Sequence, residues 1–539
     1  MIFTSLFPDV PLMNRPIADE LLEAIWSHGT ANPAHKAFVV AETRESITYH
    51  QLYLASLSVG SYLRERLKFG RGDLACAVMR NCWEYYALFF GCALCGGGLS
   101  GAIELHQQFA DSRAKLIVCN ESAVPTVLKA AKNCPNLQKI IVVDAQVNGR
   151  KYENGIELIG FNELLREQPK LTHTNKNVDL KNDIVLLPYS SGTTGVMQGN
   201  YNYGAMLRIA FSHYDQQVAK RMDSNWNWRN EHIQSVLPFY HNFGFTTTLV
   251  ALIGGATCVV IKKYEPRIFL KTLQDYKIRL VFMVPPMILL LAKSDLVFEY
   301  SLQHLTFIQA GAAPLGKEVI EAVHQRIPSI KQISQGYGMT ELSFGNHLPV
   351  YGEADQSASG KLLANCQMKI RDLKTSAWLG VDQPGELYIK GPIRMIGYFN
   401  KPEATRETID EDGFVKTGDV GRIDNSGQIF IVDRIKELIK VKGYQVAPAE
   451  LEALLLTNSR IRDCAVFGVP HISNGEAPKA FVVRADPTLT EQEVLDYVKA
   501  RAAPYKQLHG GVVFIENVPK SPSGKILRRQ LREQVKAKL

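Results

Sequence analysis

The chain has 539 residues, 46% of them hydrophobic and 21% charged, which is typical of a globular protein with more than one domain. The net charge of +8 is modest and the basic residues are scattered except in the C-terminal tail, which argues against nucleic-acid binding. The most apolar runs, 249–261 and 281–292, are shorter than the roughly 20 residues that a membrane-spanning helix needs.

Residues 1–180 alternate helical patterns with short apolar runs. Ser46 to Leu67 contains an amphipathic helix, and strands are predicted at 74–79, 116–119 and 139–143. The alternation continues with strands at 235–237, 257–261, 280–284 and 306–310. This order is typical of α/β layers built on parallel sheets.

From about Gly360 to Asp433 the pattern changes to recurring glycines and shorter strands, at 368–371, 385–390 and 428–432. We expect a twisted antiparallel, barrel-like region here. A new α/β pattern follows, with a helix at 448–457 and strands at 463–467 and 480–483. We therefore predict a large domain over 1–433, a hinge at 434–436 and a small domain over 437–539.

Both the cysteines and the C-terminus bear on the compartment. The nine cysteines show no disulfide-like or zinc-like spacing, and Cys92 and Cys95 form a lone CxxC in an apolar segment, so we expect buried, reduced thiols. The last three residues, Ala537, Lys538 and Leu539, differ by one small-for-small change from the peroxisomal Ser-Lys-Leu signal. We expect a peroxisomal location and, as a partner, the peroxisomal import receptor.

A glycine- and hydroxyl-rich loop runs from Tyr189 to Gly199, directly after the apolar run Ile184 to Leu187. Glycines let a backbone turn its N–H groups toward an anion, and hydroxyls add neutral donors. The loop lacks the Gly-Lys-Ser/Thr ending of a Walker motif. Its composition fits a polyphosphate loop and a solvated turn equally well.

Six further clusters combine turn glycines with aromatic, hydroxyl, acidic or basic side chains. They are Pro238 to Gly244, Gly311 to Pro314, Gln335 to Glu341, Thr417 to Asp419, Asp433 to Gln445, and Pro519 to Lys525.

Together the seven clusters resemble the adenylate-forming (AMP-binding) enzyme family, in the branch of 4-coumarate–CoA ligases, acyl-CoA synthetases and beetle luciferases. The resemblance extends from about Thr48 to Arg529. It implies a mixed α/β fold, with two α/β subdomains and a small β-barrel in the large domain, and a mobile C-terminal lid. It also implies two half-reactions: a carboxylic acid and ATP give acyl-AMP and pyrophosphate, and CoA then displaces AMP to give acyl-CoA. The acid is expected to be aryl or of medium to long chain.

The resemblance also implies nucleotide contacts. Phosphates would be wrapped by Ser190, Ser191, Gly192, Thr193, Thr194, Gly195 and Gln198. Adenine would lie against Ala312, Gly336, Tyr337 and Gly338, and the ribose against Asp419 and Arg434. Thr340 would contact the α-phosphate, and Glu341 would hold Mg²⁺, which prefers oxygen ligands.

For the acid and the thiol, the resemblance assigns catalysis to Lys525 and His241 and thioester formation to Lys440. The acyl pocket would comprise Tyr240, His241, Phe243, Gly311, Met339 and Phe344. Lys442, Gly443 and Gln445 would accompany Lys440, and Lys436 would act as the hinge. Each side chain also has an ordinary structural explanation: a core histidine, a turn aspartate, a helix-start glutamate, or lysines on a solvated face.

Two departures from the family pattern stand out. The phosphate loop ends in Met197-Gln198-Gly199 where relatives usually have Pro-Lys-Gly, and Ser100 to Leu105 is shortened. A charge-assisted contact contributes ~1.5–3 kcal/mol, so its loss predicts adenylation slowed about tenfold to a hundredfold, and faster adenylation if Gln198 becomes lysine. A luciferase-like oxidation of an adenylated acid, or a non-catalytic nucleotide-binding protein, are the alternatives.

Overall fold

The computed structural model describes residues 1–101, 105–132, 134, 136–145, 150–151, 156–189, 195–353, 355–442, 444–471, 473–521 and 524–536. Ser190 to Thr194, Gly443 and the C-terminal tripeptide therefore lie outside the described residues. None of the helices in the described part of the chain is long and apolar enough to cross a membrane. All nine cysteines are free, as predicted.

The first subdomain is built on a nine-stranded sheet in the order β21-β11-β10-β5-β4-β6-β7-β9-β8. The strands are β4 (Leu74–Val78), β5 (Gly98–Gly101), β6 (Leu116–Cys119), β7 (Lys139–Val142), β8 (Arg150–Lys151), β9 (Glu157–Gly160), β10 (Ile184–Leu186), β11 (Val196–Gly199) and β21 (Gly397–Tyr398). The central ladders β5-β4-β6-β7-β9 are parallel, which confirms the predicted α/β layering. The phosphate loop connects β10 to β11, which are antiparallel.

Two smaller sheets form the second subdomain. One has the order β12-β13-β2-β3 and the other β14-β15-β16. Their strands are β2 (Lys36–Val40), β3 (Ser46–Thr48), β12 (His232–Ser235), β13 (Thr257–Val260), β14 (Leu280–Met283), β15 (Phe307–Ala310) and β16 (Gln332–Gln335). β14, β15 and β16 are parallel, so the motif residues that follow β15 and β16 emerge at the same edge.

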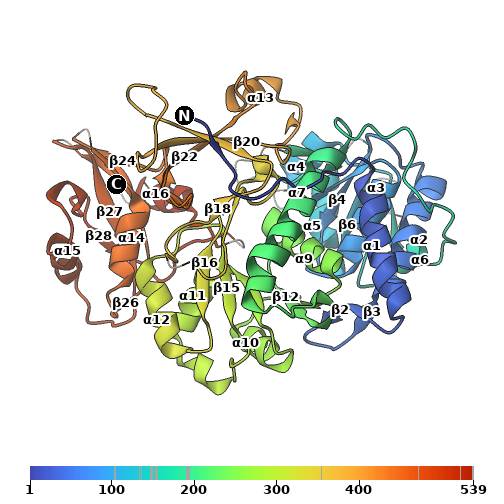
Figure 1. Cartoon of the computed structure of the whole chain (residues 1–539), viewed down its shortest axis with the longest axis horizontal. Helices are drawn as coiled ribbons and strands as arrows, with labels where there is room; N and C mark the ends of the chain where they lie inside the picture. Colours follow the sequence, from blue (N-terminus) through green and yellow to red (C-terminus); the bar gives the residue numbers. More distant parts are fainter. Residues whose placement is uncertain are drawn as a thin grey trace.

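The helices cover these sheets (Figure 1). They include α1 (Ile17–Ala31), α2 (Tyr49–Leu67), α3 (Glu84–Leu94), α7 (Asn200–His213), α9 (Asn242–Gly254), α11 (Pro285–Lys293) and α12 (Lys317–Arg326). Most of the buried side chains form one large core, and a second cluster lies between the nine-stranded sheet and the helices 105–112 and 124–131. Thr48 starts α2 with a reciprocal capping box to Gln51, which satisfies two backbone donors. α3 is apolar on all sides because it is buried on all sides.

The region predicted to be barrel-like is an antiparallel five-stranded sheet in the order β1-β19-β20-β22-β23. Its strands are β1 (Phe3–Thr4), β19 (Gln367–Arg371), β20 (Gly385–Lys390), β22 (Val415–Ile423) and β23 (Ile429–Arg434). The pairing among the described residues does not join β1 to β23, so the sheet stays open. Its first strand comes from the N-terminus, which the sequence pattern did not indicate.

The C-terminal part packs around its own hydrophobic core at one end of the molecule (Figure 1). Its elements are β24 (Ile439–Val441), β25 (Tyr444–Val446), α14 (Pro448–Leu456), β26 (Ile461–His471), β27 (Gly475–Arg484), α15 (Glu491–Lys499), β28 (Val512–Phe514) and α16 (Arg528–Lys536). The separate core is what a domain that folds as its own unit requires.

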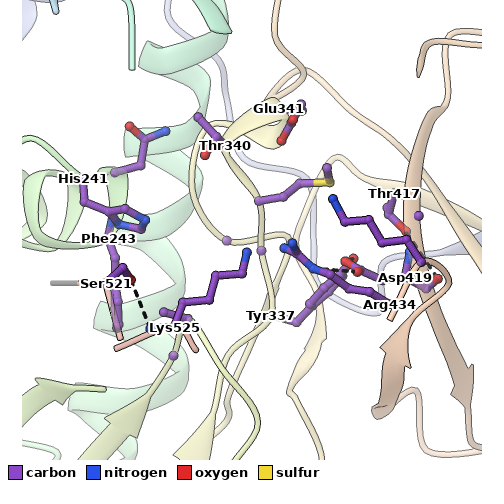
Figure 2. A pocket seen from close by; sticks show the side chains of 18 of the residues that line it. His241, Phe243, Tyr337, Thr340, Glu341, Thr417, Asp419, Arg434, Ser521 and Lys525 are labelled. Carbon is purple, nitrogen blue, oxygen red and sulfur yellow. Dashed lines mark hydrogen bonds and ion pairs between the residues drawn. The ribbon is translucent and has the colours of Figure 1, made fainter. Parts of the chain in front are cut away.

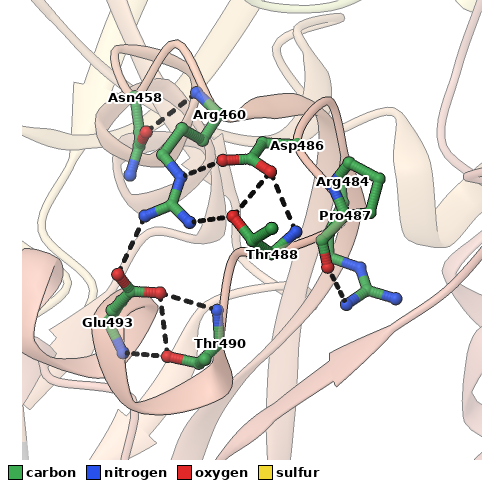
Figure 3. Close-up of polar contacts among 8 residues, drawn as sticks. All are labelled: Asn458, Arg460, Arg484, Asp486, Pro487, Thr488, Thr490 and Glu493. Carbon is green, nitrogen blue, oxygen red and sulfur yellow. Dashed lines mark hydrogen bonds and ion pairs between the residues drawn. The ribbon is translucent and has the colours of Figure 1, made fainter.

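A polar cluster at the edge of this small domain fixes the loop before α15 (Figure 3). Arg460 bridges Asp486 and Glu493 at 2.7 and 2.9 Å, and Glu493 also closes the capping box with Thr490 that starts α15. These contacts hold the small domain together on the side away from its first strands. This C-terminal small domain is called the lid.

Candidate active site

A cavity of about 1200 Å³ lies where the two subdomains, the antiparallel sheet and the lid meet. Figure 2 shows side chains from all of these parts pointing into it, among them His241, Glu341, Asp419 and Lys525. Residues separated by almost 300 positions in the sequence thus share one solvent-filled space, as the resemblance implied. For these four side chains, a shared cavity favours the functional interpretation over four unrelated structural roles.

At the nucleotide side of the cavity, Tyr337 and Asp419 contact each other. The Tyr337 hydroxyl donates a 2.7 Å hydrogen bond to Asp419 Oδ2, and Arg434 Nε lies 3.5 Å from Asp419 Oδ1. Arg434 is the last residue of β23 and pairs with Asp419 on β22, so the predicted hinge begins inside the sheet. Burial raises the pKa of Asp419, while the Arg434 guanidinium opposes that shift. Asp419 can therefore accept hydrogen bonds from a ligand, with Arg434 beside it as the counter-ion.

His241 occupies the N-cap of α9. Its Nδ1 accepts a 3.2 Å hydrogen bond from the Phe243 backbone N–H, which assigns the proton of the neutral ring to Nε2. Burial, and then the charge of Lys525, lower the pKa of His241 to about 4. The ring is therefore a neutral hydrogen-bond donor at physiological pH, facing the cavity rather than the core.

Lys525 reaches the cavity from a loop of the lid (Figure 2). The Lys525 backbone N–H donates to Ser521 Oγ at 3.1 Å, and a β-bridge joins Lys520 to Ile526. Burial, and then the charge of Arg434, lower the pKa of Lys525 to about 8. Gly524 has φ +81°, and a Cβ there would lie 3.0 Å from Pro286 Cδ, so glycine lets this loop approach the main body closely.

Glu341 lines the cavity from the short helix Thr340–Leu342. Its Oε1 accepts a 2.8 Å hydrogen bond from the Tyr398 hydroxyl, and its backbone carbonyl accepts one of 2.8 Å from Met395. No cluster of three metal-ligating side chains occurs among the described residues. One oriented carboxylate fits a Mg²⁺ ion that takes its other ligands from phosphates and water. Tyr398 is a site residue that sequence reasoning missed.

The predicted acyl pocket is present as one wall of the cavity. Tyr240, His241, Phe243, Gly311, Met339 and Phe344 all line it. The rings of Phe243 and Phe344 lie 5.9 Å apart, and a Cβ on Gly311 would lie 2.8 Å from the Phe243 ring. Gln309, Gly345 and Leu348 also line the cavity and were not predicted, because a glutamine inside a buried strand carries no sequence signal.

Of the residues predicted to contact adenine and phosphate, some line the cavity and others do not. Ala312, Gly336, Gly338 and Thr340 line the cavity with Tyr337. Ala312 has φ +72°, a conformation that alanine rarely adopts, and its side chain is exposed. Gly195 is joined to Tyr189 by a β-bridge and its carbonyl accepts from Phe399 at 2.8 Å, so it belongs to the sheet edge.

Gln198 differs from its prediction. Its side chain is fully buried and does not line the cavity: Nε2 donates to the Thr340 carbonyl at 2.7 Å, and Oε1 accepts from Ser343 Oγ at 2.6 Å. It lies on the buried face of β11, so its amide ends in these hydrogen bonds and does not face an outgoing pyrophosphate. The charge argument drawn from the sequence therefore does not apply at this position.

The proposed thioester residues lie at the margin of the cavity. Lys440 and Gln445 face each other across β24 and β25 and line the cavity, as does Lys436. Lys442 is exposed, outside the cavity lining, with φ +48°. Gly101 belongs to the shortened segment Ser100 to Leu105, and a Cβ there would lie 2.8 Å from Tyr240 Cα, so Gly101 packs against a residue of the predicted acyl pocket.

Comparison with known proteins identifies the family. The family model of the AMP-binding enzyme matches residues 26–399, and that of the AMP-binding enzyme C-terminal domain matches 450–525. The chain therefore belongs to the AMP-binding enzyme family. It is 34% identical to probable 4-coumarate–CoA ligase 3 of Dictyostelium discoideum, over 98% of this chain and 97% of that one.

The other relatives include a luciferin 4-monooxygenase of Luciola mingrelica, 38% identical over 95% of this chain and 93% of that one. Among solved structures, an anthranilate CoA ligase in complex with anthranoyl-AMP superposes with a TM-score of 0.84, at 21% identity over 98% and 99% of the two chains. The two relatives confirm the branch of the family that the motifs indicated, and the solved structure confirms the fold.

Proposed function

We propose that the protein is an ATP-dependent acid–thiol ligase that makes an acyl-CoA through an acyl-AMP intermediate. The observation that supports this most directly is the meeting of Lys525, His241 and Asp419 around one cavity. A carboxylate and the α-phosphate of ATP are both anions. They approach each other only where positive charge and oriented donors offset their repulsion.

In the first half-reaction a carboxylate oxygen attacks the α-phosphorus, and the bond to the β-phosphate oxygen breaks to release pyrophosphate. The Lys525 ammonium offsets the negative charge that gathers between the carboxylate and the α-phosphate. The neutral Nε2–H of His241 donates to the acyl oxygen without adding a second buried charge. Asp419 accepts from the ribose hydroxyls, and Glu341 would hold Mg²⁺, which offsets phosphate charge when bound.

In the second half-reaction the CoA sulfur attacks the acyl carbonyl, the carbonyl–phosphate bond breaks and AMP leaves. Lys440 lies exposed on β24, at the outer margin of the cavity, with its backbone N–H held by Glu476 at 2.7 Å. A rotation of the lid about the segment that contains Lys436 would bring Lys440 to the acyl carbonyl and withdraw Lys525, which is a gating step.

The acid is proposed to carry an aryl or medium-length tail. Two phenylalanine rings form the wall of the pocket, and they favour an apolar or aromatic tail over acetate.

The experiment is a panel of carboxylic acids assayed for pyrophosphate, AMP and acyl-CoA. Aryl or medium-chain acids should be the best substrates, and acetate should be poor. Light from added luciferin without thioester formation would favour the luciferase-like alternative instead. Binding of ATP with no acyl-AMP from any acid would favour the non-catalytic alternative.

A peroxisomal location is also part of the proposal. It is supported by the tripeptide Ala537-Lys538-Leu539 and by the basic, polar residues that precede it. The import receptor would be the partner that reads this tripeptide.

A further inference from the structure

The turn between Glu341 and the acyl pocket has an unusual backbone. Ser343 has φ 66° and ψ −40°, and the Phe344 N–H donates to the Leu342 carbonyl at 2.8 Å across it. This is a γ-turn of the rare kind, which is strained for a residue other than glycine. Such a conformation persists only where its surroundings hold it.

Three separate elements hold this γ-turn. The Ser343 hydroxyl lies 2.6 Å from Gln198 Oε1 on β11 and 2.7 Å from the Ile393 carbonyl, and its one hydrogen is shared between these acceptors. The Ser343 carbonyl accepts from Asn242 Nδ2 at 2.5 Å. Ser343 is fully buried, so no solvent replaces these bonds.

Among these three partners of Ser343, only Gln198 also has a hydrogen bond to Thr340, on the other side of the turn. Its Nε2 donates to the Thr340 carbonyl, which accepts from the Ser343 N–H as well, at 3.0 Å. One amide therefore fixes the residue before Glu341 and the residue before Phe344. The first carries the proposed metal ligand and the second a wall of the acyl pocket.

The chemistry of this position favours a neutral amide. The oxygens around the Gln198 side chain are a carbonyl and a hydroxyl, both uncharged. A lysine ammonium here would be buried with no carboxylate among these partners, and burying an unpaired charge is costly. The amide donates to the Thr340 carbonyl and accepts from the Ser343 hydroxyl at the same time, which neither lysine nor methionine can do.

We infer that Gln198 is a positioning residue for adenylation: its buried amide holds the Ser343 γ-turn, and through it Glu341 and Phe344, instead of contacting phosphate. This inference rests on the proposed ligase function. It reverses the expectation from the sequence, because lysine at this position should now slow the reaction.

The test compares Gln198→Lys, Gln198→Met and Gln198→Glu in the full chain, with pyrophosphate release measured against ATP and against the acid. Gln198→Lys and Gln198→Met should lower kcat by ~10-fold to 100-fold, because a displacement of about 1 Å has effects of this size. Both should also raise KM for the acid, because Phe344 moves. Gln234→Met is the matched control: Gln234 is also buried, and its Nε2 donates to one carbonyl, that of Phe269, at 3.1 Å.

Gln198→Glu adds a readout that general destabilisation would not change. A protonated carboxyl has the shape of the amide and can donate to the Thr340 carbonyl, whereas the ionised form only accepts. Burial raises the pKa of such a carboxyl, so the activity relative to the unaltered protein should rise as the pH falls. A ratio that does not change with pH would contradict the inference.

Faster pyrophosphate release by Gln198→Lys would overturn the inference and restore the phosphate-contact explanation. Losses no larger than those of Gln234→Met would show that Gln198 only supports stability, which also overturns it. Failure of the ligase proposal is a different result, since the unaltered protein would then form no acyl-AMP from any acid in the panel.

Discussion

The Tyr337 hydroxyl donates a 2.7 Å hydrogen bond to the carboxylate of Asp419, although the two residues are 82 positions apart. Tyr337 follows β16 of the second subdomain, and Asp419 lies on β22 of the antiparallel sheet. The contact joins two parts of the large domain at the point where a nucleotide sugar and base would lie. It orients the carboxylate before the ribose arrives.

This contact gives the first prediction. Tyr337→Phe keeps the ring but removes the donor, and a hydrogen bond to a charged group contributes ~1.5–3 kcal/mol. We expect KM for ATP to rise about tenfold to a hundredfold while KM for CoA stays unchanged. Tyr388→Phe is the control: Tyr388 lies on the neighbouring strand β20, outside the cavity lining, and its hydroxyl accepts from Arg371 at 3.3 Å. Equal effects on ATP in both variants would contradict the assignment.

The second prediction concerns pH. Lys525 acts as a cation, and its pKa is lowered to about 8, so the active form is lost as pH rises through that value. The kcat/KM for the acid in adenylation, which reports the free enzyme, should fall above about pH 8. Lys525→Arg keeps the charge at all these pH values and should remove the fall, whatever its absolute rate. A descending limb that persists in Lys525→Arg would assign it to another group.

His241 should contribute no limb to the same profile near neutral pH. Because its pKa is about 4, the ring is already neutral from pH 6 upward. A profile with no limb near neutral pH would therefore support the assignment of the limb above about pH 8 to Lys525.

The third prediction follows from the 2.8 Å hydrogen bond between Tyr398 and Glu341. Tyr398→Phe releases one carboxylate oxygen, so Glu341 is less well oriented toward a metal ion. We expect the Mg²⁺ concentration needed for half-maximal pyrophosphate release to rise several-fold, with the rate at saturating Mg²⁺ close to that of the unaltered protein. An unchanged Mg²⁺ requirement would indicate that Tyr398 does not serve the metal site.

The fourth prediction tests targeting. Deleting Leu539 from a fluorescent fusion that leaves the C-terminus free should turn a punctate peroxisomal signal into a diffuse one. The full-length fusion is the control, because deleting an internal residue such as Lys479 of β27 would disrupt the lid. Puncta that remain after deletion of Leu539 would reject the tripeptide as the signal.

The sequence predicted the parts of the site that depend on ordered local motifs. Strands β14 and β15 were predicted as apolar runs, whereas β16, which contains two glutamines, was not. The parallel order of the three strands places the residues after them at one edge. His241, Tyr337 and Asp419 were assigned through the family resemblance, and all three line the same cavity. The antiparallel sheet was also legible, but not the N-terminal strand β1, because two residues carry no periodicity.

What the sequence did not reveal depends on side-chain direction and on long-range hydrogen bonds. Gln198 was assigned by motif position to phosphate, whereas the pleat of β11 turns its amide inward toward Ser343. Tyr398 and Gln309 carry no local pattern either, since their partners come from other strands. The γ-turn at Ser343 is equally invisible, because serine is compatible with many backbone conformations and only the packing around it selects this one.

The measurement that tests the ligase account most directly separates the two half-reactions in Lys525→Ala and Lys440→Ala. Pyrophosphate release from acid and ATP is measured beside thioester formation from supplied acyl-AMP and CoA. Lys525→Ala should abolish the first and keep the second, whereas Lys440→Ala should keep the first, accumulate acyl-AMP and lose the second. Lys436→Pro should resemble Lys440→Ala if it arrests the lid with Lys525 in the cavity. Equal damage to both half-reactions by Lys525→Ala and Lys440→Ala would contradict the account.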